Sequence, residues 1–209
     1  MLDLYQGFWQ ELNIGEGDFV ISADEKSIQA LSRGERYGAG IGRIGRYDYE
    51  YTRHGTIIYL AALDVFSGHI IGRTSQTNGI EPFTKLVDDV MSSPPYNKAN
   101  RVFWIIDNGG SHHPSTFPAR LKTHYPNATA VHLPTHASWL NQIEIYFSIL
   151  TRKMLKPNDF DSLEDLVAKL LSFEAIYNET AKPFNWKFTK DDLKQRLDQM
   201  HHTLYGFTK

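Results

Sequence analysis

The stretch Arg101-Val102-Phe103-Trp104-Ile105-Ile106, followed by Asp107-Asn108-Gly109-Gly110, decides the fold of this chain. Its first six residues have almost no polar interruption, which is typical of a strand that is buried on both faces. Such strands lie in the middle of sheets that carry helices on both sides. The Asn-Gly-Gly that follows is a turn signal. We therefore predict a central strand with the Asp107 carboxylate at its carboxyl end.

The segments on either side of this strand predict the rest of an α/β fold. Three β-rich segments before it, residues 19–24, 56–65 and 70–74, predict an antiparallel meander, and residues 128–133 after it predict one more strand. Apolar residues at helical spacing predict helices over 83–91 and 118–125, and then three helical stripes that begin near Ile143, Leu163 and Leu193. This order predicts a mixed sheet with helices on its faces.

Length and composition fit one globular domain. The chain has 209 residues, 41% of them hydrophobic, which is enough to bury a sizeable core. It contains no cysteine, which excludes disulfides and thiolate zinc sites. The acidic start lacks the features of a secretory signal, and no stretch approaches the roughly 18 apolar residues that span a bilayer. We expect a soluble, cytoplasmic protein. Its formal net charge of −2 means that any DNA contact must come from local patches.

Two carboxylates stand at the ends of strongly apolar strands, Asp24 after the first and Asp107 after the most buried. If these strands are parallel neighbours, their carboxyl ends meet where α/β sheets bind ligands. The two carboxylates then raise each other's pKa unless a cation lies between them. Oxygen ligands without thiolates indicate Mg²⁺ or Mn²⁺. The alternative is that each Asp is only a turn residue, and for either one taken singly this alternative is favoured.

Glu144 has a structural alternative of its own. The run Asn141-Gln142-Ile143-Glu144 fits an N-cap followed by an acid that closes a capping box, and taken alone this interpretation is favoured. The same position keeps a carboxylate ionised through the helix dipole, which suits a metal ligand. The segment between Asp107 and Glu144 supports the second interpretation. It contains no Asp or Glu and holds five of the nine histidines, as a surface facing phosphates requires.

Residues 30–55 are predicted to be irregular and form a candidate nucleic-acid loop, because Arg binds phosphates and Tyr stacks on bases. The loop carries Arg33, Arg36, Arg43, Arg46 and Arg53 with Tyr37, Tyr47, Tyr49 and Tyr51. Its acids Glu35, Asp48 and Glu50 weaken the patch, so a flexible surface loop is an equally weighted alternative.

Three more side chains have open interpretations. His112 and His113 follow Asp107 closely enough to reach a substrate phosphate or the surroundings of a metal, and a capping or surface role carries equal weight. Asp64, in the second strand, is a rival ligand, but hairpin geometry favours a structural role.

Five motifs occur in order along the chain. They are Ser22-Ala23-Asp24-Glu25-Lys26; Tyr51-Thr52-Arg53-His54-Gly55-Thr56 leading to Ala61-Ala62-Leu63-Asp64; Ile105-Ile106-Asp107-Asn108-Gly109; His136-Ala137-Ser138-Trp139-Leu140-Asn141-Gln142-Ile143-Glu144; and Lys182-Pro183-Phe184-Asn185-Trp186-Lys187-Phe188-Thr189. Together they resemble bacterial insertion-sequence transposases related to the mariner group, over nearly the whole chain. Gln142 departs from the pattern, because many mariner relatives have Pro there.

The resemblance implies an RNase H-like fold, a mixed five-stranded sheet with helices on both faces, and a catalytic triad of Asp24, Asp107 and Glu144. It also implies Mg²⁺, with Mn²⁺ as a substitute, and we expect two ions. Terminal inverted repeats are the implied substrate and a TA dinucleotide the implied target, and a homodimer is expected on DNA. Residues 1–209 are then one catalytic domain, with a core over about 18–155 and C-terminal helices over 156–209. The family's N-terminal helix-turn-helix region is absent from it.

The predicted function is metal-dependent DNA strand cleavage and strand transfer at transposon ends. We expect DNA contacts from the motifs and the Arg-rich stretch: Arg43, Arg46, Arg53, His54, Asn108, His112, His113, Trp139 and Asn141. One alternative is a non-catalytic DNA-binding or assembly remnant of a transposase. Another is a two-carboxylate glycosidase, which needs no divalent ion.

Overall fold

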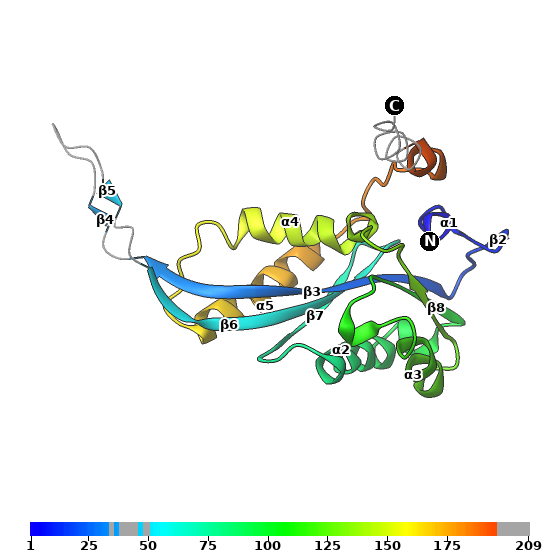
Figure 1. The fold of residues 1–209 in the computed structure, drawn as a ribbon, viewed down its shortest axis with the longest axis horizontal. Helices are drawn as coiled ribbons and strands as arrows, with labels where there is room; N and C mark the ends of the chain where they lie inside the picture. The colour runs from blue at the N-terminus through cyan, green and yellow to red at the C-terminus, as the bar shows by residue number, and fades with distance from the viewer. Residues whose placement is uncertain (34–35, 38–45, 48–50, 196–209) are drawn as a thin grey trace, which may run out of the picture.

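The computed structural model describes residues 1–33, 36–37, 46–47 and 51–195, and its main feature is a five-stranded sheet in the order β7-β6-β3-β8-β9 (Figure 1). Strands β3 (Asp18–Arg33), β6 (Tyr51–Asp64) and β7 (Ile70–Ser75) form an antiparallel meander. Strand β8 (Arg101–Ile106) lies parallel to β3, and β9 (Ala128–His132) lies parallel to β8. The predicted α/β class and mixed five-stranded sheet are confirmed.

Strand β8 is buried on both faces, as its sequence predicts. Five of its six residues are buried, and Trp104 is fully enclosed. Val102, Trp104 and Ile106 join one apolar cluster, whereas Phe103 and Ile105 join another on the opposite face. The continuous apolar run therefore fills two cores at once and fixes Asp107 at the point where the strand ends.

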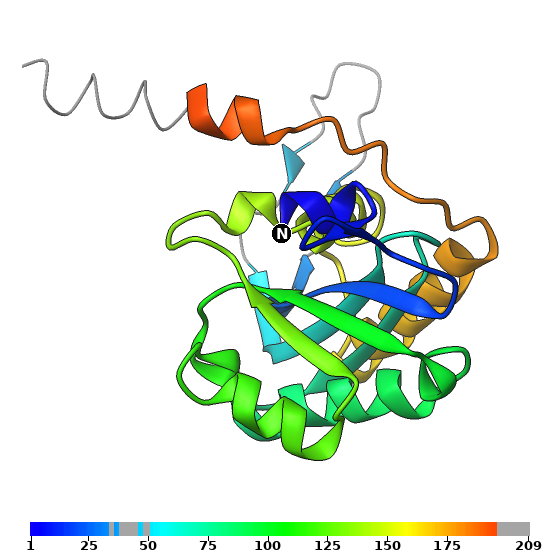
Figure 2. The same cartoon turned by 90° about the vertical axis from the view of Figure 1, so that its right-hand side faces the viewer.

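Helices cover both faces of the sheet (Figures 1 and 2). On one face, α2 (Ile80–Ser92) and α3 (Phe117–His124) pack against the sheet around Phe83 and Trp104. On the other face, α4 (Ile143–Lys153) and α5 (Leu163–Glu179) pack around Tyr59 and Tyr146. Helix α5 begins as predicted, because the Ser162 hydroxyl accepts a hydrogen bond from the Asp165 backbone N–H at 3.1 Å.

A third apolar group joins the start of the chain to its C-terminal part (Figure 2). It includes α1 (Leu2–Tyr5), which is followed by the small β1 (Phe8–Trp9) and β2 (Leu12–Asn13) pair. Residues 190–195 are helical, and the Lys190 ammonium lies 2.6 Å from the Asp3 carboxylate. Short 3-10 turns complete the connections: η1 (Tyr96–Lys98), η2 (Gly110–His112) and η3 (Ser138–Leu140).

The prediction that residues 30–55 are irregular is wrong at both ends. Strand β3 continues to Arg33, β6 begins at Tyr51, and short strands β4 (Arg36–Tyr37) and β5 (Arg46–Tyr47) pair with each other. The long β3–β6 ladder forms because Ile28, Ala30 and Ile57 are buried in the cluster beneath α4 and α5. Tertiary packing thus extends strands that local glycine content argues against.

The last predicted helical stripe, from Leu193 to Leu204, lies mostly outside the described residues; only its start falls in the helical segment 190–195. Within the part of the chain that the structure describes, no helix combines the length and apolar character needed to cross a membrane.

Candidate active site

Asp24 and Asp107 line one hollow at the edge where β3 and β8 separate. The last β3–β8 pair joins Ser22 to Ile105, and each strand presents its acid two residues later. The two strands are parallel neighbours, as the interpretation of a shared site requires. The prediction that the first strand ends at Asp24 is wrong, because β3 continues to Arg33 and only its pairing with β8 ends near Asp24. The hollow measures about 390 Å³, and Glu25, Asn78, Gly79 and residues 109–112 complete its lining.

Asp24 is buried, with 8% of its surface exposed. Burial raises its pKa to about 7, against the effect of a hydrogen bond from the Glu25 backbone N–H at 2.7 Å. The negative charges of Asp107 and Glu144 raise the pKa further. Asp24 is thus a buried acid that senses both of the other predicted catalytic acids.

Asp107 is more exposed than Asp24, and its pKa moves the other way. A hydrogen bond with the His112 ring lowers the pKa of Asp107 below its usual value, against the effect of partial burial. The Gly109 backbone N–H donates to the same carboxylate at 2.8 Å and lowers the pKa further. Asp107 is therefore held as a carboxylate in a fixed orientation.

The His112 ring is one member of a hydrogen-bonded chain that crosses the floor of the hollow. His112 is 2% exposed, with Nε2 on Asp107 and Nδ1 at 2.9 Å from the Ser111 hydroxyl. Ser111 in turn donates to the Glu25 carboxylate, which belongs to β3. The ring of Phe83 lies 4.6 Å from that of His112, centroid to centroid. This chain links the segment after β8 to the middle of β3 through side chains.

The start of α4 is held against β3 by Asn141. Its amide Nδ2 donates to the Ala23 carbonyl at 3.0 Å and approaches Asp24 at 3.4 Å, while its Oδ1 accepts from the Ser22 hydroxyl. Ser22 Oγ also accepts from the Ile143 backbone N–H at 2.9 Å, so a strand residue caps the helix. The capping box interpretation of Asn141 and Glu144 is wrong, because the helix begins after Gln142 without a side-chain cap from its own chain neighbours.

Glu144 stands in the first turn of α4 and lines a separate hollow of about 300 Å³, together with Lys26 and Phe147. Its charge reaches Asp24, yet the three acids do not form one preformed cluster. In the part of the chain that the structure describes, no group of three or more His, Cys, Asp or Glu is arranged to hold a metal ion. The donor chemistry nevertheless fits a hard divalent cation, since all three side chains offer carboxylate oxygens and Asp24 is buried beside like charges.

Some of the residues predicted to contact DNA are exposed, and others form hydrogen bonds within the protein. Arg53, His113 and Trp139 are exposed, and the Trp139 ring meets that of Phe188 at 5.0 Å. Arg43 lies outside the described residues, as does the side chain of Arg46.

Four others form hydrogen bonds within the protein. His54 Nε2 lies 2.7 Å from the Ser32 hydroxyl, and Asn108 donates to the Leu133 carbonyl at 3.0 Å. His112 and Asn141 are buried, so their side chains are not accessible to DNA in this structure. They contact the acids instead, His112 at Asp107 and Asn141 at Asp24.

Asp64 has the structural role that hairpin geometry favours. Its carboxylate accepts from the Phe66 backbone N–H at 3.0 Å and from the Tyr96 hydroxyl at 3.1 Å. These contacts fix the turn between β6 and β7, so Asp64 does not compete as a ligand.

Sequence reasoning missed Ser22, Glu25 and Ser111, which support the acids. The sequence carries a weak signal for Ser22, because this polar residue interrupts the apolar run of β3. In the structure it is fully buried. A buried hydroxyl needs partners, which here come from Asn141 and Ile143. No such signal marks Ser111 or Glu25, whose contact joins residues far apart in sequence.

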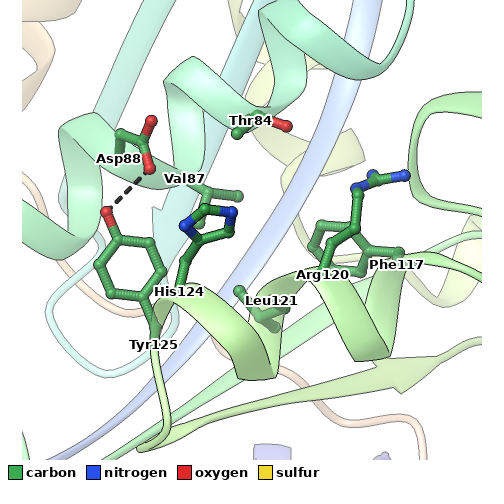
Figure 3. A pocket seen from close by; sticks show the side chains of 8 residues that line it. All are labelled: Thr84, Val87, Asp88, Phe117, Arg120, Leu121, His124 and Tyr125. Atoms are coloured by element: carbon green, nitrogen blue, oxygen red, sulfur yellow. Dashed lines mark hydrogen bonds between the residues drawn. The ribbon is translucent and has the colours of Figure 1, made fainter.

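A different hollow lies between α2 and α3 (Figure 3). Its floor is apolar, with Val87, Phe117 and Leu121, and the Tyr125 hydroxyl donates to Asp88 at 2.8 Å along one side. At about 40 Å³ it is too small for a nucleotide, and none of the three acids lines it. The chemistry therefore belongs to the acid edge of the sheet.

Comparison with known proteins adds a family and a fold. The model of the family described as DDE superfamily endonuclease matches residues 20–167, a range that includes all three acids. No curated protein matches the chain.

Solved structures share the fold, among them three Mos1 complexes. The Mos1 mariner paired end complex with Mn is 18% identical, with a TM-score of 0.54 over 75% of this chain and 48% of that one. A pre-cleavage Mos1 transpososome is 16% identical, with a TM-score of 0.54 over 78% of this chain and 49% of that one. The Mos1 strand transfer complex is 16% identical, with the same TM-score over 75% and 47%. The predicted RNase H-like fold is confirmed by this likeness, and the chain spans about half the length of these proteins.

Proposed function

Because this chain belongs to the DDE superfamily endonuclease family, we propose that it is a transposase catalytic domain that cuts and joins DNA strands with Asp24, Asp107 and Glu144. One observation supports this proposal most directly. Asp24 and Asp107 lie just past the last pair of two adjacent parallel strands and line one hollow, and the charge of Glu144 acts on Asp24. A buried acid beside two like charges is stabilised as a carboxylate when a cation binds.

The carboxylates of Asp24, Asp107 and Glu144 would hold Mg²⁺, or Mn²⁺ as a substitute, with two ions in the mechanism that we propose. When bound, such ions lower the pKa of an attacking water or 3′-hydroxyl and stabilise the departing oxygen. Asp107 is prepared for this role because His112 and Gly109 fix its carboxylate. Asp24 would hold the cation as a carboxylate, and the Asn141 amide, 3.4 Å from it, would orient that carboxylate.

The partners of the reaction are also part of the proposal. The neighbours named paired end and strand transfer complexes support DNA as the partner. The resemblance to mariner-related transposases adds terminal inverted repeats as the substrate and a homodimer on DNA to the proposal. The motifs shared with mariner-related insertion-sequence transposases suggest a TA target. Residues 1–209 would act as one catalytic unit, with the core over about 18–155 and the C-terminal helices over 156–209. Since the chain covers about half of each neighbour, the proposal concerns the chemical step above all.

The test is nicking of supercoiled plasmid by the purified protein in Mn²⁺ or Mg²⁺. We expect Asp107→Asn to lower the rate at least about a thousandfold, because removal of one member of a catalytic set removes most of its effect. Asp88→Asn is the matched control, since it neutralises an exposed carboxyl on α2. Equal nicking by wild type and Asp107→Asn would assign the activity to a contaminant or another site.

A non-catalytic DNA-binding remnant is the second candidate. It is favoured by the lack of a ready-made three-ligand metal group in the described part of the chain. DNA binding without cleavage at any Mn²⁺ or Mg²⁺ concentration would support the remnant and overturn the transposase proposal.

A further inference from the structure

Strand β3 has an open edge next to the acids. Strand β8 pairs with β3 only from Asp18 to Ser22, although β3 continues to Arg33. The edge is covered again near the far end of the two-stranded ribbon that β3 and β6 form. There, the Asn158 side chain donates to the Gln29 carbonyl at 2.8 Å and accepts from the Leu31 N–H at 3.1 Å. Between these points, no third strand pairs with β3 among the described residues.

Helix α4 runs beside this open edge, and the segment that follows it continues to the far end of the ribbon (Figure 1). Two hollows lie between them. The first, of about 300 Å³, begins at Glu144 and includes Lys26, Thr151 and Arg152. The second, of about 680 Å³, also includes Lys26 and Thr151 and extends to Lys156 and Asn158. Because they share two lining residues, the hollows adjoin, and we call the two together the β3–α4 groove.

The charge of the β3–α4 groove is positive. Its cations are Lys26, Arg33, Arg152 and Lys156. Among the described residues that line it, Glu144 is the only acid and lies at the end next to Asp24. Hydroxyl and amide side chains fill the spaces between the cations: Ser27, Gln29, Ser148, Thr151 and Asn158. Cations interleaved with small hydrogen-bonding side chains are what a phosphodiester backbone requires.

Contacts within the protein account for only some of the four groove cations. Arg152 stands in the last turn of α4, where a cation stabilises the helix dipole. Arg33 has a partner too, since its guanidinium lies 5.7 Å from the Tyr51 ring. The Lys26 ammonium lies 5.7 Å from the Phe147 ring, and Lys156 lies exposed beyond the helix. The lysines therefore have no structural partner of opposite charge among the described residues that line the groove.

We propose that the β3–α4 groove binds the phosphodiester backbone of a DNA strand and leads it to Glu144 and the acid hollow. The inference rests on the proposed function, because it takes the strand that is cut as the occupant. The five residues of β3 from Lys26 to Ala30 span roughly 14 Å, which is four steps of about 3.4 Å. That length matches about five phosphates of one duplex strand, which advance about 3.4 Å each along the axis.

The test measures DNA affinity by fluorescence anisotropy over a series of salt concentrations. A chelator is present so that cleavage does not interfere. The double variant Lys156→Gln with Arg152→Gln removes two groove cations. The matched control, Lys98→Gln with Lys122→Gln, removes two exposed cations elsewhere and changes net charge equally. We expect the groove variant to lower the slope of log affinity against log salt by about two and to weaken binding roughly tenfold or more. The control should leave both unchanged.

The outcomes separate the groove from the proposed chemistry. Equal slopes for the two double variants would overturn the groove even if the wild-type protein nicks DNA in Mn²⁺. A smaller slope for the groove variant alone, with no metal-dependent nicking by wild type, would keep the groove and overturn the proposed function. Absence of any DNA binding by wild type at low salt would overturn the groove.

A cross-linking measurement does not depend on affinity. Since the chain has no cysteine, Ser148→Cys places a single thiol in the groove, and Ser92→Cys places one on α2. Both serines are exposed and donate to a helix carbonyl four residues earlier, which makes them matched positions. DNA carrying a mixed disulfide tethered to a phosphate should couple to Ser148→Cys by exchange and release the small thiol. Equal coupling to Ser92→Cys would contradict the groove.

Discussion

Asp24 and Asp107 face the same hollow, yet their surroundings move their pKa values in opposite directions. Burial beside two other acids raises the pKa of Asp24 to about 7. A hydrogen bond with His112, together with the Gly109 N–H, lowers the pKa of Asp107. One side chain therefore tends to hold a proton near neutral pH while its neighbour is held ionised. Such a divided pair indicates that the site is incomplete until a cation neutralises it.

The largest effect on folding should come from Asp24→Asn. Its folded-state pKa lies above the unfolded value, so the stability of wild type falls as pH rises from about 4 to 7. Above pH 7 the variant should be more stable, by on the order of 4 kcal/mol at about 1.4 kcal/mol per pKa unit. Urea unfolding in chelator at pH 5 and pH 8 measures this gain, which should be larger at pH 8.

Asp107→Asn should show the opposite sign, and it serves as the control for Asp24→Asn. The lowered pKa of Asp107 contributes stability above its unfolded value, which is lost as pH falls through the folded value. The variant should therefore be less stable than wild type at pH 7 and converge with it in acid. Mg²⁺ should stabilise wild type at pH 8 and not Asp24→Asn. A stability difference for Asp24→Asn that does not vary with pH would contradict the comparison.

The sequence predicts the acids better than it predicts what holds them. Strand β8 and its end at Asp107 follow from a local hydrophobic run. A second run locates the part of β3 that carries Asp24, but it does not predict that β3 continues to Arg33. The contact of Ser22 with Asn141 joins residues that are distant in the chain, and no periodicity encodes it. The contact of Ser111 with Glu25 is of the same kind.

The β3–β6 ribbon and the β3–α4 groove could not be predicted for related reasons. Ala30 and Gly55 look like loop residues, but they pair because Ile28 and Ile57 are buried under α4 and α5. Lys26 looks like an ordinary charged residue beside Glu25. Only the fold brings it to the groove that contains Arg152 and Lys156.

A smaller effect is expected from His112→Ala, which removes the partner that distinguishes Asp107 from Asp24. The pKa of Asp107 should rise toward its ordinary value, because the first cause of its lowering is gone. Affinity for Mn²⁺ should fall by roughly 10- to 100-fold, the usual effect of losing a residue that orients a ligand. Calorimetric Mn²⁺ titration measures the affinity, and carboxyl NMR measures the pKa.

His113→Ala is the control for this change, since His113 is exposed and its side chain forms hydrogen bonds only with Ser115 among the described residues. It should leave Mn²⁺ affinity and the pKa of Asp107 unchanged. If the two histidine variants behave alike, the hydrogen bond of His112 does not set the state of Asp107.

The smallest effect should come from Gly109→Ala, which changes the space around Asp107 without removing a partner. A Cβ at Gly109 would lie 3.0 Å from Asp107 Oδ1 and 3.0 Å from His112 Nε2, so one of these atoms must shift by a few tenths of an ångström. The backbone of Gly109 is extended with φ −60°, so the substitution adds no backbone strain. We expect Mn²⁺ affinity to fall by a few-fold, about 1 kcal/mol or less. Gly110→Ala, whose Cβ would meet nothing within 4 Å, should have no effect. If both variants bind Mn²⁺ like wild type, the orientation of Asp107 is not what prepares the site, and burial of Asp24 must be the dominant difference between the two acids.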